Sequence, residues 1–239
     1  MKKRQFFLIS LMFVAMGTVN FSCGNTNGVN PAAYSRIQII NAIAGSSSLD
    51  CTLNSTKINT TTIAFPTTTG YISATPGTKY VEIRPTSTPT APFIDTATVV
   101  LKQDSSYSLF FAGQSGTTKS IMIQDDLSAP TLGRAKVRFV NASSAAGNLS
   151  ITINAVAAPE YANIAYCGVG KFIEVPAGTY EFKAFATGAT NTNTLGTLSN
   201  QVLADGKVYT LYARGIIGNT GTTSAFGLSL ITNLLPAIK

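Results

Sequence analysis

The sequence predicts an all-β protein made of two tandem immunoglobulin-like antiparallel β-sandwich domains of about seven strands each. Three observations predict this fold: the 239-residue chain repeats itself, the matched blocks alternate apolar and polar residues, and turn residues separate the blocks. The composition agrees, because Thr, Ser, Asn, Ala and Gly dominate, charged residues make up 11%, and Trp and His are absent. Such a chain suits many short strands joined by polar turns.

The internal repeat has an offset of about 100 residues. The matched blocks are Arg36–Ala42 with Lys136–Ala142, Leu49–Asn54 with Leu149–Asn154, Gly77–Ile83 with Gly178–Ala184, and Tyr107–Gly113 with Tyr209–Gly215. Within them, Ile37 and Ile39 correspond to Val137 and Phe139, so apolar residues recur with the period of two expected of half-buried strands. We therefore expect each strand to fill a core on one side and face water on the other.

The repeat sets the expected domain boundaries. Residues 35–126 form the first sandwich repeat and residues 134–239 the second. Segment 127–133 is predicted to be a short linker, because Pro130 and Gly133 interrupt strand pairing and no periodic pattern crosses it.

The first 22 residues are expected to be a signal peptide. Three basic residues stand within the first four positions, followed by an apolar run over 6–16 and a short polar stretch. That run is too short for a membrane-spanning helix, which needs roughly 20 residues. The mature protein is therefore expected to be exported.

Ser22 and Cys23 resemble the lipobox of bacterial lipoproteins, in which the cysteine becomes the acylated N-terminus. Asn20 and Phe21 depart from the usual pattern, so cleavage by ordinary signal peptidase at a nearby bond is the alternative. With lipidation at Cys23, residues 23–34 become a tether, the lipid bilayer becomes a partner, and the outer membrane becomes the expected location, on a face that the sequence does not indicate.

The charge excludes one class of partner. Without the signal peptide, 14 basic and 10 acidic residues remain, a scattered net charge of +4. Nucleic-acid-binding proteins concentrate Lys and Arg on one face, so no nucleic-acid partner is expected. Arg134, Lys136 and Arg138 alternate along one strand; we interpret them as a solvent face that blocks edge-to-edge pairing, with an anion-binding patch as the alternative.

Three blocks of the second repeat carry a family resemblance. Ala135–Ser143, Val175–Tyr180 and Tyr209–Gly215 look like hallmark blocks of the domain of unknown function 4397 family. The second repeat resembles it best, whereas the first has Thr75-Pro76-Gly77 where the family shows Pro-Ala-Gly. Two tandem copies would cover nearly the whole mature chain. The resemblance implies bacterial envelope proteins, often lipoproteins, with a sandwich fold and no assigned activity.

Catalytic chemistry is mostly excluded by what the sequence lacks. Without histidine, Ser-His-Asp and Cys-His catalysis and imidazole metal sites are impossible. The Ser-x-x-Lys arrangement, the P-loop, the dinucleotide fingerprint and the calcium loop are also missing. Asp125 and Asp126, adjacent in an extended segment, are expected to point apart. We expect no enzyme, no catalytic residue, no metal and no cofactor, a glycosidase built from distant carboxylates being the weaker alternative.

Cysteines and tyrosines supply the remaining candidates. Cys51 is expected to be a core side chain and Cys167 a loop residue, with a disulfide between them as the alternative. Tyr161 and Tyr166 lie in a long loop and either form a small sugar-binding platform or pack against their own loop or the neighbouring domain. Counting strands places the long loops of the second domain at one pole and the domains head to tail, which favours a contact between the domains. The reach of the linker leaves side-by-side packing as the alternative.

Two functions follow for the mature protein. The first is a non-catalytic structural or interaction module of the cell envelope, contacting envelope proteins or polysaccharide. The alternative is a carbohydrate-binding surface lipoprotein.

Overall fold

The computed structural model describes residues 34–88, 90–188 and 193–234, so the expected signal peptide and Cys23 lie outside the described residues. Within these ranges the chain forms sixteen strands, one short 3-10 turn at Pro159–Tyr161 and no α-helix. The prediction of an all-β sandwich fold is confirmed. In the described part, no helix is long and apolar enough to cross a membrane.

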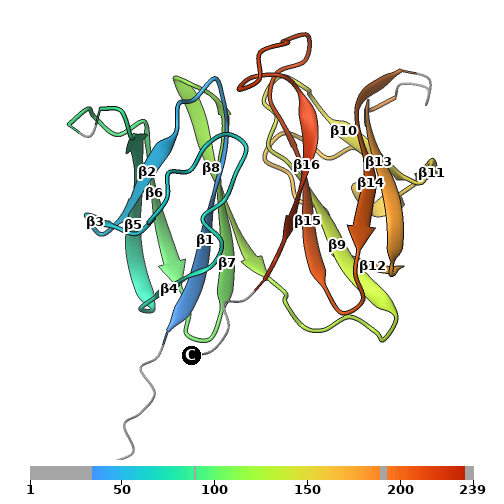
Figure 1. The fold of residues 1–239 in the computed structure, drawn as a ribbon, viewed down its shortest axis with the longest axis horizontal. Coiled ribbons are helices and arrows are strands. Elements are labelled where there is room, and N and C mark those ends of the chain that lie inside the picture. Colours follow the sequence, from blue (N-terminus) through green and yellow to red (C-terminus); the bar gives the residue numbers. More distant parts are fainter. Residues whose placement is uncertain (1–33, 89, 189–192, 235–239) are drawn as a thin grey trace, which may run out of the picture. The chain divides into compact units, whose positions relative to one another are not determined.

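The first repeat is a sandwich of two four-stranded sheets (Figure 1), with strand orders β4-β1-β7-β8 and β3-β2-β5-β6. The strands are β1 Ser35–Ala44, β2 Leu49–Leu53, β3 Thr56–Lys57, β4 Ile72–Ala74, β5 Gly77–Pro85, β6 Asp95–Leu101, β7 Ser106–Gln114 and β8 Thr117–Asp125.

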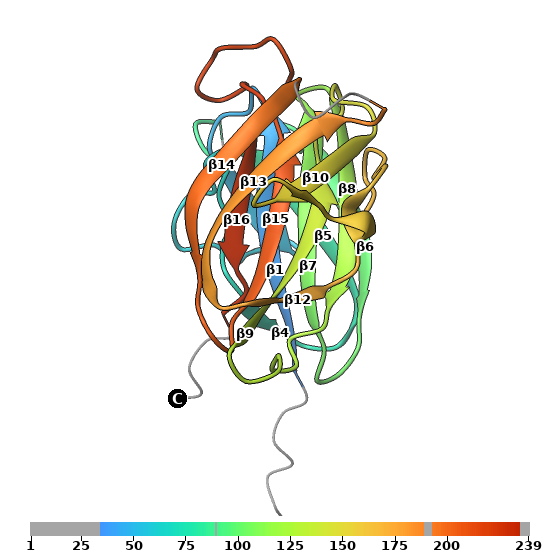
Figure 2. The same cartoon turned by 90° about the vertical axis from the view of Figure 1, so that its right-hand side faces the viewer.

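The second repeat reproduces this topology with the orders β12-β9-β15-β16 and β11-β10-β13-β14. Figure 2 shows β10, β13 and β14 in front of β9, β15 and β16. The strands are β9 Arg134–Asn141, β10 Leu149–Ile153, β11 Val156–Ala157, β12 Ile173–Pro176, β13 Gly178–Ala186, β14 Thr194–Leu203, β15 Val208–Arg214 and β16 Gly227–Thr232.

Each sandwich encloses its own apolar core, as the alternation predicted. Ile37 and Ile39 lie in the first core with less than 2% of their surface exposed, and Val137 and Phe139 lie in the second. Phe182 of β13 is completely buried in the second core. The matched blocks therefore place equivalent side chains in equivalent places.

The sheets are not antiparallel throughout. β1 pairs with β7 in parallel, from Arg36 opposite Ser106 to Ala44 opposite Gln114, and β9 pairs with β15 in the same way. The connection after β3 crosses to the other sheet and adds β4, so each repeat has eight strands instead of about seven. With eight strands, an even number, each repeat ends at the pole where it starts, whereas a count of seven predicted that it ends at the opposite pole.

The head-to-tail arrangement is also wrong, because the sandwiches pack side by side. The sheets β4-β1-β7-β8 and β12-β9-β15-β16, named the inner sheets here, share a third apolar cluster that includes Ile40, Phe110, Val140 and Tyr212. The central strands of these sheets, β1, β7, β9 and β15, are consequently buried on both faces, which is the usual cause of continuous apolar runs.

The two sandwiches point the same way within the compact unit formed by residues 33–239. At the ends of β1 and β7, Gly45 donates to the Thr223 carbonyl at 2.8 Å and Gln114 donates to Ser144 at 3.4 Å. Toward the other end, Asn233 donates to the Tyr71 hydroxyl at 3.0 Å. We call the end where β1 starts and β16 finishes the chain-end pole, and the opposite end the loop pole.

Candidate functional site: the seam between the repeats

The contact between the inner sheets, named the seam here, contains a buried ion pair. Arg138 Nη2 lies 2.5 Å from Asp125 Oδ1, and the two side chains are 2% and 0% exposed. Asp125 also accepts hydrogen bonds from the Tyr71 hydroxyl at 2.6 Å and the Ser108 hydroxyl at 2.8 Å, while Arg138 Nε donates to Thr210 Oγ1 at 3.0 Å. The charged groups of both partners are therefore held inside one hydrogen-bonded network.

The predicted solvent face of β9 is wrong at two of its three positions. Arg138 lies in the seam, and Lys136 is buried with Nζ 2.7 Å from Asp126 Oδ2. Only Arg134 keeps much exposed surface. Alternation was read correctly, but the side opposite the core packs against another sheet instead of facing water.

The adjacent carboxylates occupy different environments, in agreement with side chains that point apart. Burial raises the pKa of Asp125, an effect opposed by the Arg138 charge and by hydrogen bonds from Tyr71 and Ser108. Hydrogen bonds from Lys136 and Ser128 lower the pKa of Asp126 to about 2. Each carboxylate thus fixes a cation of β9 and links the end of the first repeat to the second.

A groove of about 600 Å³ opens beside the seam, between the 66–68 segment of the first repeat and β15 and β16 of the second. Tyr212 joins the two sides by donating its hydroxyl to the Pro66 carbonyl at 3.2 Å. Arg214 is the charged residue of its lining, which is otherwise made of hydroxyl-bearing and apolar residues. Sequence reasoning missed this groove because its walls lie about 150 residues apart in the chain.

The structure places the two candidate tyrosines in different environments. Tyr161 is completely buried in the second core and donates its hydroxyl to the Val137 carbonyl, so its ring is not available to a sugar. Tyr166 packs against the cluster shared by the inner sheets, with Lys119 Nζ 5.6 Å from its ring centre. The Tyr166 hydroxyl approaches Gly113 so closely that an added Cβ would come within 2.6 Å. Tyr166 thus touches the first repeat, whereas Tyr161 does not line the seam.

Cys51 and Cys167, the two described cysteines, do not form the disulfide that was the alternative. Cys51 and Cys167 are both free thiols, with Cys51 in the first core. Burial raises the pKa of Cys51 to about 12, so its thiol is protonated and unreactive near neutral pH. Among the described residues there is no group of three or more side chains suited to hold a metal ion.

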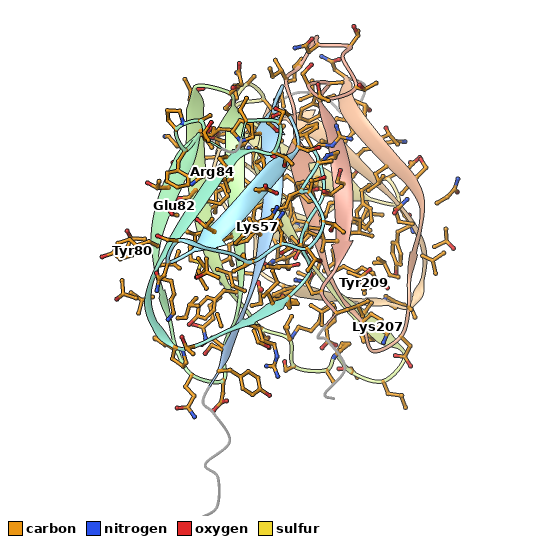
Figure 3. All side chains as sticks on the ribbon, turned by 60° about the vertical axis from the view of Figure 1, so that its left-hand side comes forward. Lys57, Tyr80, Glu82, Arg84, Lys207 and Tyr209 are labelled. Carbon is orange, nitrogen blue, oxygen red and sulfur yellow. The ribbon has the colours of Figure 1, made fainter. Side chains whose placement is uncertain are left out.

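The outward face of β5 carries a row of polar side chains that is separate from the charged residues of β9 (Figure 3). Tyr80, Glu82 and Arg84 point away from the first core, and Tyr80 is 59% exposed. Glu82 accepts a hydrogen bond from Thr52 at 2.9 Å, and Lys57 pairs with Asp50 at 2.8 Å. These contacts stay within one sheet, so the row has the character of an ordinary solvated face.

Comparison with protein families gives one match. Residues 35–152 match the domain of unknown function DUF4397. The match starts with β1 and ends in β10, so it covers the first repeat and only the beginning of the second. The second repeat was expected to carry the stronger resemblance, but the blocks after Thr152 lie outside the match. No curated protein matches the chain.

Three solved structures show a distant similarity. The N-terminal domain of AlgF from P. aeruginosa is 22% identical over 40% of this chain and 98% of that domain, with a TM-score of 0.31. The Bacillus anthracis TIE protein is 12% identical over 76% of this chain, with a TM-score of 0.23. A leucine-rich repeat protein from Bacteroides thetaiotaomicron VPI-5482 is 14% identical over 74%, with a TM-score of 0.18. The chain covers 33% and 25% of the latter two proteins.

Proposed function

We propose that this protein is a non-catalytic, lipid-tethered module of the bacterial envelope, exported to the outer membrane, that acts by surface contact with its two repeats working as one body. The observation that carries the proposal is the seam, in which Asp125 and Arg138 join the sandwiches through a buried ion pair. A pair of sandwiches fastened in this way supports the presentation of a single continuous surface.

The distribution of charged residues supports one end of the molecule, the loop pole, as the end that contacts a partner. By sequence, six connections at the loop pole contain no Asp, Glu, Lys or Arg; they are 45–48, 86–94, 115–116, 142–148, 187–193 and 215–226. The 158–172 connection, which also reaches this pole, carries Glu160 and Lys171. Charged residues gather instead in the connections of the chain-end pole, namely Lys102, Asp104, Asp126, Asp205 and Lys207. Because β1, which the tether precedes in the sequence, starts at the chain-end pole, the loop pole is the end available to a partner.

We also propose that the second repeat is a second, diverged copy of the DUF4397 domain. Its strand order repeats that of the first repeat in both sheets, and β9 pairs with β15 in parallel as β1 does with β7.

The contact function is tested by photo-crosslinking in cells at one exposed position of each pole. A photoreactive side chain at Ser115, at the loop pole, should give protein or polysaccharide adducts that the same group at Gln103, at the chain-end pole, does not give. Equal adducts at both positions, or adducts only at Gln103, would contradict the proposal.

The tether is tested separately. Mass spectrometry of the membrane fraction should find an acylated Cys23 as the N-terminal residue, since two or more acyl chains anchor a protein stably. A free amino terminus at another residue, in protein recovered without membrane, would overturn lipidation.

A further inference from the structure

We propose that the groove beside the seam binds a hydroxyl-rich ligand with one anionic group, a sugar acid or a sugar phosphate, through Arg214. The inference rests on the proposed function in treating the protein as a contact module, and it gives that module a ligand class. It also moves carbohydrate binding from the Tyr161 and Tyr166 loop to a different place.

Residues of both repeats hold Arg214 in place. Nε donates to Ser229 Oγ at 3.0 Å, Nη1 donates to the Ala225 carbonyl at 2.9 Å, and the guanidinium lies 5.3 Å from the ring centre of Phe65. These bonds use two of the five N–H donors of an arginine. Nη2 has no hydrogen-bond partner among the described residues and lies over Gly227, where an added Cβ would meet it at 3.2 Å. A guanidinium group that is held in place and keeps unused N–H donors is suited to bind a carboxylate or phosphate.

The charge of Arg214 is not compensated within the described protein. Arg138 and Lys136, the buried cations of the seam, each pair with an aspartate, whereas no described carboxylate lies within ion-pair distance of Arg214. Arg214 is nevertheless half-buried, and this burial lowers its pKa. Removing a cation from water is costly unless an anion approaches it. The groove therefore favours a negatively charged ligand.

The rest of the lining fits a ligand that, apart from its anionic group, is uncharged and rich in hydroxyl groups. Thr67, Thr68 and Ser229 bring hydroxyl groups to the groove, and Leu230 brings an apolar side chain. Each hydroxyl has one donor and two acceptor positions, more than its bonds within the protein use. The volume of about 600 Å³ lies within the usual range of small-molecule sites, about 300 to 1,000 Å³. One cation surrounded by hydroxyls matches one anionic group on a sugar, and a polyanion would leave most of its charges unmatched.

The test is a chemical-shift titration of the isotope-labelled full chain in detergent micelles with glucuronic acid, glucose 1-phosphate and glucose. The two anionic sugars should bind at least about tenfold more tightly than glucose and shift signals of residues around Arg214. Arg214→Gln should weaken binding of the anionic sugars at least about tenfold. Arg36→Gln removes the same charge from the chain-end pole and should leave binding unchanged.

A second variant keeps the proposal testable if Arg214→Gln fails to fold. Ser229→Glu places a carboxylate beside Arg214, where it should compete with the ligand and abolish anion binding. Ser229→Gln, of the same size without the charge, removes the same hydroxyl, so it is the reference for the effect of the charge: it should bind the anionic sugars more tightly than Ser229→Glu does. The two anionic probes separate the sources, because binding of one alone identifies a sugar acid or a sugar phosphate.

Some results would overturn the proposal: shifts with none of the three sugars, equal binding of glucose, or undiminished binding in folded Arg214→Gln or Ser229→Glu protein. These titrations need neither the tether nor the loop pole. A groove that binds nothing, in a protein that still crosslinks at Ser115, would remove this inference alone. A groove that binds while Ser115 gives no adducts would remove only the proposed contact function.

Discussion

At the scale of single residues, Asp125 is held in the seam by more contacts than the ion pair alone. A buried carboxylate is costly unless it is paired and hydrogen-bonded. Asp125 meets that condition through Arg138, Ser108 and Tyr71, whose hydroxyl in turn accepts a bond from Asn233 of the second repeat. The network therefore uses residues of both repeats, and either partner alone would be an uncompensated charge at their contact.

Replacing Asp125 by alanine should destabilise the full chain by about 3 to 5 kcal/mol, because Arg138 would remain buried without its counter-charge. The double variant Asp125→Leu with Arg138→Met should recover much of that loss, since no unpaired charge remains. Urea unfolding at pH 7 measures both. A loss below about 1 kcal/mol in the single variant would mean that the seam opens to water around Arg138.

Phe182→Ala should cost about 3 to 5 kcal/mol, because it leaves a cavity in the closed core of the second repeat. The matched control is Val202→Ala at an exposed position, which should change the free energy of unfolding by no more than about 0.5 kcal/mol. A silent Phe182→Ala would show that the inward face of β13 has been assigned wrongly.

At the scale of elements, β9 is fastened near its start by Lys136, which reaches Asp126 at the end of the first repeat and Ser128 of the linker. These bonds hold the pKa of Asp126 at about 2, below its ordinary value of 3.8. A carboxyl group whose pKa is lower in the folded state stabilises above its unfolded pKa, and this contribution disappears as the pH falls through the folded pKa.

Asp126→Asn should therefore lower stability slightly at pH 7 and make much less difference near pH 2, where the Asp126 carboxyl of the folded protein is already being protonated. The effect is expected to be at most about 1 kcal/mol, because the Asp126 side chain is 61% exposed and solvent screens the pair. Urea unfolding at a series of pH values from 7 to 2 measures the gap between variant and parent. A gap that stays constant down to pH 2 would show that the linker does not depend on this ionised carboxylate.

The strands also show how far sequence alone could reach. Period-two alternation located most strands and their core faces, as Ile37 and Ile39 of β1 illustrate. It could not locate the seam, because the second apolar face depends on a contact between segments distant in sequence. Adjacent apolar pairs such as Ile39-Ile40 and Phe110-Phe111 were the available signal, since a half-buried strand does not need them. The charged seam residues gave no such signal, because an arginine in an alternating strand ordinarily faces water.

At the scale of the whole molecule, each repeat has a closed core, and a third apolar cluster lies between them. The groove of Arg214 depends on this arrangement, because Pro66 and Phe65 come from the first repeat and Ser229 from the second. A binding site formed in this way exists only while the repeats are docked, so the stability of the seam and occupancy of the groove should be thermodynamically linked.

Residues 134–239 expressed alone should still fold cooperatively, because the core around Phe139 and Phe182 is complete within that repeat. The full chain should unfold in one transition at a higher urea concentration, because separating the repeats would expose apolar side chains such as Val140 and Tyr212. Chemical unfolding of both proteins, followed by circular dichroism, gives the two midpoints.

Addition of a ligand that binds the groove should raise the midpoint of the full chain and leave that of the isolated repeat unchanged, because the wall of the groove that the first repeat supplies is absent from the fragment. An unfolded fragment would show that the second core needs the seam, and two separate transitions in the full chain would show that the ion pair does not couple the repeats.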